Sequence, residues 1–167
     1  MALATLEDVF ADQIEDLYSA ETQLVDALPK IAAAASDEKL RDAIEHHLDE
    51  TREHVERLSQ IREDLGISGS QKCKGMAGLI AEGDETLNKV GGGAAKDAAI
   101  IAAAQRVEHY EIAAYGTART LAGELGHGDA EKLLGQTLDE ESAADTMLTK
   151  IATGGLFRSG LNAEAHA

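Results

Sequence analysis

Only one proline, Pro29, occurs in this sequence of 167 residues. Because proline breaks the interior of both helices and strands, its scarcity favours long uninterrupted elements. Apolar residues recur at helical spacing through four long segments, and the glycines cluster where those segments end. With hydrophobic residues at 44% and aromatic residues at only 3%, the core must consist of Leu, Ile, Val and Ala. The pattern predicts an all-α protein built from packed helices.

Residues that start and stop helices give approximate bounds to these segments. Asp37, beside Ser36, is a candidate cap for the second helix. Gly126 is a natural helix end, and Asp129 follows as a start. We expect helices at about 4–34, 37–65, 75–89, 95–124 and 129–153, and a loose tail at 154–167, in a single domain that spans 1–167.

The connections between the long helices restrict the fold. Two short connections flank one long crossover. The crossover contains the short amphipathic helix expected at 75–89 and a glycine joint at 91–93. This is the plan of a ferritin-like four-helix bundle with an extra helix in the crossover. A plain up-down bundle or an array of helical hairpins fits the same pattern, whereas no repeat of 20–50 residues supports a solenoid.

The formal net charge of −16 argues against several classes of partner. No cluster of Lys and Arg is apparent, so we expect neither nucleic acid nor an anionic membrane as a partner. An acidic exterior attracts cations, but plain solubility explains it equally well. The lone Cys73 excludes an intrachain disulfide and fits a reducing cytosol. Since neither a signal peptide nor a membrane-spanning apolar run is visible, we expect a cytoplasmic protein.

Several acidic side chains fall within apolar helix faces instead of opposite them. An α-helix turns by about 100° per residue, so each residue can be placed relative to its apolar stripe. Glu21, Glu108 and Glu141 each lie in the stripe of a different helix. The carboxylates Glu111 and Asp145 follow one turn along, whereas Glu50 and His54 lie at the edge of the stripe on 37–65. The expected metal ligands are Glu21, Glu50, His54, Glu108, Glu111, Glu141 and Asp145.

A metal pair is the simplest way to stabilise such a cluster. Buried carboxylates repel one another unless they are protonated, paired with a cation or bound to metal. Only Arg57 and Arg119 lie near enough to be considered as ion-pair partners. The alternatives without metal are a hydrogen-bonded or protonated Glu at each position, with Glu50 on the rim and Asp145 capping polar neighbours.

Other polar residues near the stripes have less specific expectations. Tyr18 and Tyr115 lie beside the carboxylates, where they either donate hydrogen bonds to the ligands or only fill the core. The remaining histidines are expected at the surface; they are His46, His47, His109, His127 and His166.

The ligand spacing departs from the standard di-metal pattern. Ferritin-like sites take a Glu from each of two helices and a Glu-x-x-His pair from each of the other two. Here Glu50 and His54 are four apart, and Ala144 occupies the position three after Glu141. The carboxylate-rich set favours two iron ions, with manganese as the alternative, that react with O₂ or peroxide. A single tightly bound metal also remains open.

Three stretches carry a resemblance to a known family. TLEDVFADQIEDLYSAETQL, GMAGLIAEG and AAAQRVEHYEIAAYGT, in this order, resemble the YciE/YciF family of ferritin-like stress proteins over about residues 5–153. The resemblance implies a rubrerythrin-related bundle that forms a homodimer in bacterial stress responses and binds and oxidises iron. It matches Glu21 to YSAE, Glu108 and Glu111 to EHYE, Glu141 to DEES, and Glu50 to an acidic position. The alternative is a dimeric helical stress protein without catalysis that binds a partner and has a weak or vestigial metal site.

Overall fold

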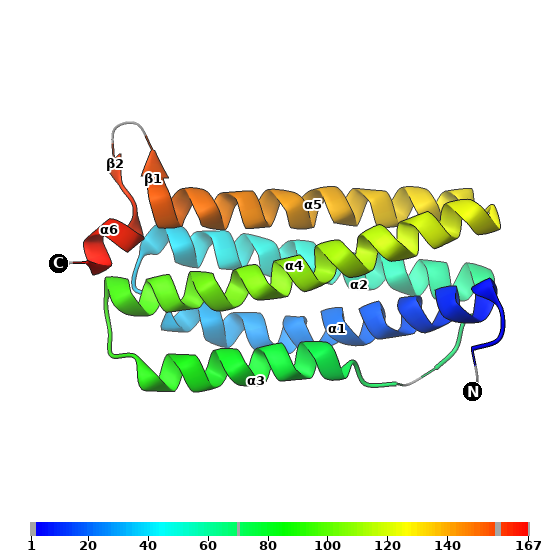
Figure 1. Cartoon of the computed structure of the whole chain (residues 1–167), viewed down its shortest axis with the longest axis horizontal. Coiled ribbons are helices and arrows are strands. Elements are labelled where there is room, and N and C mark those ends of the chain that lie inside the picture. Colours follow the sequence, from blue (N-terminus) through cyan, green and yellow to red (C-terminus); the bar gives the residue numbers. More distant parts are fainter. Residues whose placement is uncertain (1–2, 70, 156–157, 167) are drawn as a thin grey trace.

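Four long helices run side by side, and a shorter helix lies in the crossover between the second and the third of them (Figure 1). The computed structural model describes residues 3–69, 71–155 and 158–166. The helices are α1 (Leu6–Ala34), α2 (Glu38–Leu65), α3 (Lys74–Lys89), α4 (Ala94–Leu125) and α5 (Gly128–Thr153). The predicted ferritin-like four-helix bundle with an extra crossover helix is confirmed.

Local sequence signals explain where the helices begin and end. Asp37 caps α2 as expected, because its side chain accepts the Leu40 N–H at 2.9 Å. Gly66 and Gly126 end α2 and α4 in the left-handed conformation, with φ of 65° and 77°. A side chain is rarely tolerated at such φ values, so glycine sets the reversal after each helix.

A buried carboxylate ties the two halves of the chain together at one end of the bundle. Asp97, in the first turn of α4, is 2% exposed. Its two oxygens accept the backbone N–H groups of Ser36 at 2.7 Å and Asp37 at 3.0 Å. The start of α4 is therefore fixed against the turn that joins α1 to α2.

Buried apolar side chains form two clusters, one toward each end of the bundle. The first includes Leu24, Leu28, Ile100 and Leu148. The second includes Phe10, Leu17, Leu58 and Leu134. The middle of the bundle lies between these two clusters. No described helix combines the length and apolar character needed to cross a membrane.

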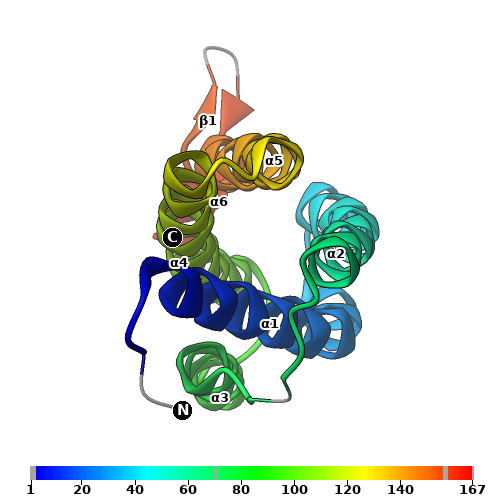
Figure 2. The ribbon, with the colours of Figure 1, turned by 90° about the vertical axis from the view of Figure 1, so that its right-hand side faces the viewer.

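Helix α3 covers one side of the bundle. Figure 2 shows α3 outside α1 and α4, on the side of the bundle away from α2 and α5. Met76 of α3 is buried in the first apolar cluster, and the Sγ atom of Cys73 accepts its N–H at 3.3 Å. The long crossover thus contributes to the core.

The C-terminal segment was expected to be loose, and its described residues differ from that expectation. Strands β1 (Gly154–Gly155) and β2 (Arg158–Ser159) pair antiparallel and are followed by the short helix α6 (Leu161–Ala165). Leu161 is buried in the first apolar cluster. Gly160 packs so closely on the end of α5 that an added Cβ would lie 2.3 Å from the Ala152 carbonyl oxygen. One apolar residue and one glycine therefore dock a segment whose composition gave no helical signal.

Candidate metal centre

Six ionisable side chains meet in the middle of the bundle, between the two apolar clusters. They are Glu21 of α1, His47 and His54 of α2, Glu108 and Glu111 of α4, and Glu141 of α5. All six are buried, and four of them are 0% exposed: Glu21, His54, Glu111 and Glu141. Each long helix supplies at least one member because helical periodicity turns these positions toward the bundle axis.

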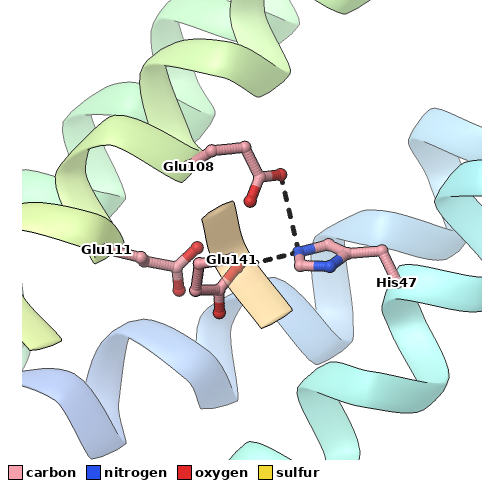
Figure 3. Close-up of side chains that lie close together, drawn as sticks. All are labelled: His47, Glu108, Glu111 and Glu141. Atoms are coloured by element: carbon pink, nitrogen blue, oxygen red, sulfur yellow. Dashed lines mark ion pairs between the residues drawn. The ribbon is translucent and has the colours of Figure 1, made fainter. Parts of the chain in front are cut away.

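One group of four side chains surrounds a first potential metal position. His47, Glu108, Glu111 and Glu141 each offer a ligand atom within 4.8 Å of the others. The Nε2 atom of His47 lies 3.5 Å from Glu108 Oε1 and 3.7 Å from Glu141 Oε2 (Figure 3). Three carboxylates and one imidazole are a donor set that suits iron or manganese.

A second group lies next to the first and shares one residue with it. Glu21, His54 and Glu141 also bring ligand atoms within 4.8 Å of one another. The Nδ1 atom of His54 lies 3.0 Å from Glu141 Oε1 and 3.4 Å from Glu21 Oε1. Glu141 belongs to both groups, so its carboxylate could contribute a ligand atom to each.

Many polar atoms of this cluster lack hydrogen-bond partners. Eight buried side-chain N and O atoms have no hydrogen-bond partner in the described part of the chain, and every one belongs to these six residues. Within that part, the ion-pair contacts of Glu21, Glu108 and Glu141 are with histidine alone. Unpartnered buried polar atoms are costly, so their concentration at one place fits a site that needs an added cation.

The carboxylates are strongly perturbed by their surroundings. Burial is the largest cause that raises the pKa values of Glu108 and Glu111 well above the usual range. The negative charges of neighbouring carboxylates act in the same direction. Burial also raises the pKa of Glu21. For Glu141, burial acts in the same direction, but the contacts with His54 and His47 outweigh it and lower the pKa. Of the four carboxylates, Glu141 is thus the one whose pKa the histidine contacts hold below its ordinary value.

The two histidines respond in the opposite way. Burial alone would lower the pKa values of His47 and His54, but the surrounding carboxylates outweigh it. The pKa rises to about 9 for His47 and to about 10 for His54. Without metal, these imidazolium groups supply the positive charge that the cluster otherwise lacks.

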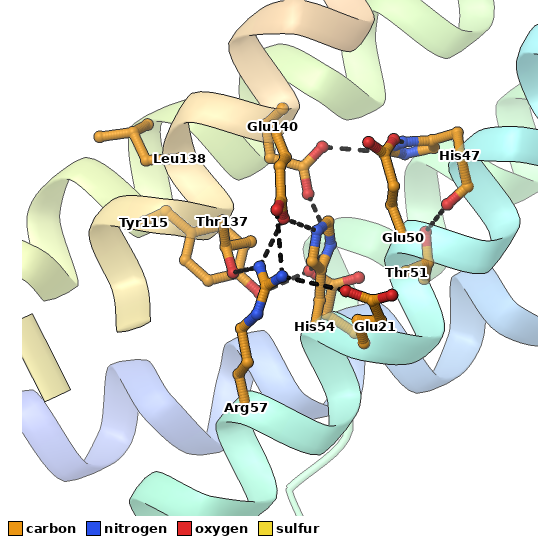
Figure 4. Close-up of polar contacts among 12 residues, drawn as sticks. Glu21, His47, Glu50, Thr51, His54, Arg57, Tyr115, Thr137, Leu138 and Glu140 are labelled. Carbon is orange, nitrogen blue, oxygen red and sulfur yellow. Dashed lines mark hydrogen bonds and ion pairs between the residues drawn. The ribbon is translucent and has the colours of Figure 1, made fainter. Parts of the chain in front are cut away.

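His54 is held from its outer side by a second carboxylate. Its Nε2 atom lies 2.9 Å from Glu140 Oε2 (Figure 4). Arg57 donates hydrogen bonds to both oxygens of Glu140 and to Thr137 Oγ1. Such a contact fixes the ring orientation and leaves Nδ1 free for the cluster. Glu140 is not among the ligands expected from the sequence, because its role depends on α2 and α5 being neighbours.

Two tyrosines near the stripes have different surroundings. Tyr115 is fully buried, and its hydroxyl donates a hydrogen bond of 2.5 Å to Glu21 Oε1. Tyr18 lies beneath Arg62, whose guanidinium carbon is 4.1 Å from the ring centroid. The structure therefore places Tyr115 against the cluster and Tyr18 outside it.

The structure brings together five of the seven residues expected as ligands and leaves two at the margin. Glu50 is half-buried, with Oε1 3.4 Å from His46 Nε2 and Oε2 3.6 Å from His47 Nδ1. Asp145 accepts a hydrogen bond from Gln105 at 3.0 Å and lies 3.3 Å from His109. Glu50 is therefore a rim residue in contact with the cluster, whereas Asp145 points toward α4 side chains outside it.

The expectation that His47 lies at the surface is wrong. Its side chain is buried and reaches Glu108 and Glu141. The sequence did contain a signal, because His47, Thr51, His54 and Leu58 follow helical spacing. In the structure, all four lie on the buried face of α2. The other histidines differ from His47: His46, His109 and His166 are exposed, and His127 is half-buried against Phe10.

Comparison with known proteins places this arrangement in a family. A family described as a domain of unknown function, DUF892, matches residues 5–162. The chain belongs to this family. Protein YciF of Escherichia coli strain K12 is 47% identical over 165 residues, which cover 97% of this DUF892 chain and 99% of YciF. The resemblance expected from the sequence motifs is thereby confirmed.

Solved structures of relatives share the fold. The crystal structure of the E. coli stress protein YciF matches with a TM-score of 0.84 and 50% identity over 87% of this chain and 93% of that one. YcfI from Rhodopseudomonas palustris matches with a TM-score of 0.87 and 42% identity over 90% and 96% of the two chains. These two structures share the helical architecture of this chain over most of their length.

Proposed function

We propose that this chain is a stress protein whose central cluster binds two iron ions, or manganese in their place, and uses them to reduce O₂ or peroxide. The observation that carries the proposal is the set of eight unpartnered buried atoms confined to six potential ligands. The similarity to the E. coli stress protein YciF supports the biological context. A homodimer, as the family resemblance implies, and the cytoplasmic location expected from the sequence are part of the same proposal.

The ligands divide naturally between two positions. His47, Glu108 and Glu111 would hold one ion, Glu21 and His54 would hold the other, and Glu141 would bridge them. The donors come from separate helices on both sides, so each ion would link the first two helices to the last two. With peroxide, two Fe²⁺ ions would each give one electron, and H₂O₂ would take two electrons and two protons to form two waters.

The chain itself orients the ligands for this chemistry, and its two histidines change protonation when a metal binds. His47 and His54, whose pKa values are raised to about 9 and about 10, are protonated near neutral pH in the metal-free protein. Both must release a proton when a metal binds at the ring nitrogen. Tyr115 orients Glu21 through its hydrogen bond, and Glu140 orients His54.

Metal binding without oxygen tests the proposal directly. We expect anaerobic titration with Fe²⁺ to approach two ions per chain and to raise the melting temperature, because a ligand that binds the native state stabilises it. Replacing Glu111, which has two unpartnered oxygens, should reduce metal binding in the Glu111→Leu variant. The same variant should keep or increase metal-free stability, because replacing buried charge by apolar volume is often neutral or stabilising.

A matched substitution on the exposed face of the same helix provides the control. Glu124 is exposed, so Glu124→Leu should leave both metal content and stability close to wild type. Fewer than about one ion bound per chain, with no change in melting temperature, would contradict the proposal. That result would favour the non-catalytic helical protein with a vestigial site.

A further inference from the structure

A large cavity opens directly from the metal-binding cluster. Its volume is about 1050 Å³, and its walls come from the four long helices, from α3 and from α6. His47, Glu50 and Glu108 form part of its wall, so the cavity and the cluster share side chains. The size is comparable to that of sites for small organic molecules, which lie near 300–1,000 Å³.

The wall of the cavity is mainly apolar away from the cluster. Leu24, Leu28, Ile44, Val107 and Leu148 line it. At the cluster, His47 Nδ1 and Glu108 Oε2 are buried and have no hydrogen-bond partner. An apolar wall that ends at a few polar atoms is typical of a site that binds an apolar body and orients a polar end.

A missing side chain contributes to the opening. Ala144 lies three residues after Glu141, where the standard ferritin-like pattern has a histidine, and it lines the cavity. A small residue at this position keeps space beside the bridging carboxylate. His47 of α2 instead provides an imidazole to the group that contains Glu141.

Charge restricts the class of molecule that can enter. Acidic side chains outnumber lysines around the cavity, with Asp26, Asp37 and Asp42 among them, and Lys30 is paired with Asp84 at 2.7 Å. The chain also carries a net charge of −16. Anionic amphiphiles are therefore disfavoured, whereas uncharged molecules are not.

We propose that this cavity binds an uncharged organic hydroperoxide, with its alkyl or aryl body against the apolar wall and its –OOH group toward His47 and Glu108. The proposal rests on the proposed function and specifies its substrate class. Reduction breaks the O–O bond: ROOH takes two electrons from two Fe²⁺ ions and two protons, and yields ROH and water. Hydrogen peroxide needs no such cavity, because it has no apolar body to bind.

Binding to the metal-free protein tests the cavity separately from the metal chemistry. The probe is decan-1-ol, an unreactive uncharged chain, titrated in the presence of a chelator and followed by calorimetry and melting temperature. We expect saturable binding, and binding of decanoate at least about tenfold weaker because of the acidic rim. Ala144→Leu should weaken decan-1-ol binding by about tenfold or more, since it fills part of the cavity.

The control is Ala113→Leu, on the exposed face of α4 and outside the cavity, which should bind decan-1-ol like wild type. Circular dichroism checks that each variant folds. If Ala144→Leu does not fold, Ala104→Leu, which is also in the cavity wall, takes its place. Absence of saturable decan-1-ol binding, or equal weakening by Ala113→Leu, would overturn the proposal even if metal binds.

A second measurement connects the cavity to the reaction. In iron-loaded protein, stopped-flow absorbance compares initial oxidation rates with cumene hydroperoxide and with hydrogen peroxide. The ratio of the two rates should fall by about tenfold in Ala144→Leu relative to wild type. An unchanged ratio would overturn the assignment of the cavity to the substrate, whereas failure to bind iron would contradict the proposed function instead.

Discussion

His54 is held between two carboxylates that belong to neighbouring residues of α5. Glu141 lies at its Nδ1 atom and Glu140 at its Nε2 atom. Arg57 neutralises Glu140 and keeps it at the ring, and these contacts lower the pKa of Glu140 despite partial burial, which acts to raise it. One residue therefore belongs to the cluster, and the adjacent one positions a ligand from outside.

Removing this outer carboxylate should weaken metal binding without removing a ligand. We expect Glu140→Ala to lower metal affinity by about 10–100-fold, because the His54 ring loses its fixed orientation. Asp139→Ala, at the adjacent exposed position, is the matched control and should bind like wild type. Affinity for Mn²⁺ by calorimetry is the measurement, and equal affinities for both variants would assign Glu140 a surface role only.

For single residues, the sequence predicted which side chains point into the bundle better than it predicted which side chains they contact. Glu21, Glu108 and Glu141 were placed on apolar stripes, and all three are buried at the bundle centre. Glu50 and Asp145 are half-buried outside the central groups, because a short or edge side chain does not reach the axis. His47 was missed because a histidine among acidic neighbours resembles a solvated face until α4 and α5 are placed opposite it.

The helices themselves could be predicted closely, because periodicity, caps and glycines all gave the same bounds. The expected 95–124 and 129–153 correspond to Ala94–Leu125 and Gly128–Thr153. The segment after Gly154 could not be predicted, since Leu161 and Gly160 obtain their environment from distant parts of the chain. Local pattern determines helices, whereas docking of a short segment depends on tertiary contacts.

The contact between the start of α4 and the α1–α2 turn contributes measurably to stability. Asp97→Ala would leave the Ser36 and Asp37 N–H groups at the start of α2 without their buried acceptor. We expect the free energy of unfolding to fall by about 2 kcal/mol, as hydrogen bonds to charged groups usually contribute about 1.5–3 kcal/mol. Urea denaturation measures the change.

The exposed Asp26 provides the control for this loss, because Asp26→Ala should change stability by less than about 0.5 kcal/mol. If Asp97→Ala lowered the free energy of unfolding no more than Asp26→Ala, water would have to accept the hydrogen bonds of the two N–H groups in place of the carboxylate. The link between α4 and the α1–α2 turn would then be dispensable.

For the whole molecule, the buried cluster couples stability to pH. The pKa values of His47 and His54 rise from 6.5 to about 9 and about 10 on folding, so their contribution is fully present below about pH 6.5. It is lost as pH rises through about 9 and 10. The raised pKa values of Glu108 and Glu111 also lower stability as pH rises. The lowered pKa of Glu141 acts in the opposite direction, because it contributes stability at pH values above the ordinary carboxyl pKa.

We therefore expect the metal-free protein to melt at a lower temperature at pH 9 than at pH 6.5. The increase in melting temperature caused by Mn²⁺ should be larger at pH 9, because binding requires deprotonated ligands. Differential scanning calorimetry with chelator or with Mn²⁺ measures both trends. His47→Gln should show a smaller pH-dependent loss, and a metal-free melting temperature that rises between these pH values would refute the coupling.

The six candidate ligands divide equally between the two halves of the chain. Glu21, His47 and His54 come from α1 and α2, and the remaining three come from α4 and α5. During synthesis, the first hairpin emerges with half of the donors, and the crossover must follow before the rest exist. Neither half can assemble the centre alone, so reactive iron would be captured only after the two hairpins have docked. Under this arrangement, metal uptake reports that folding is complete.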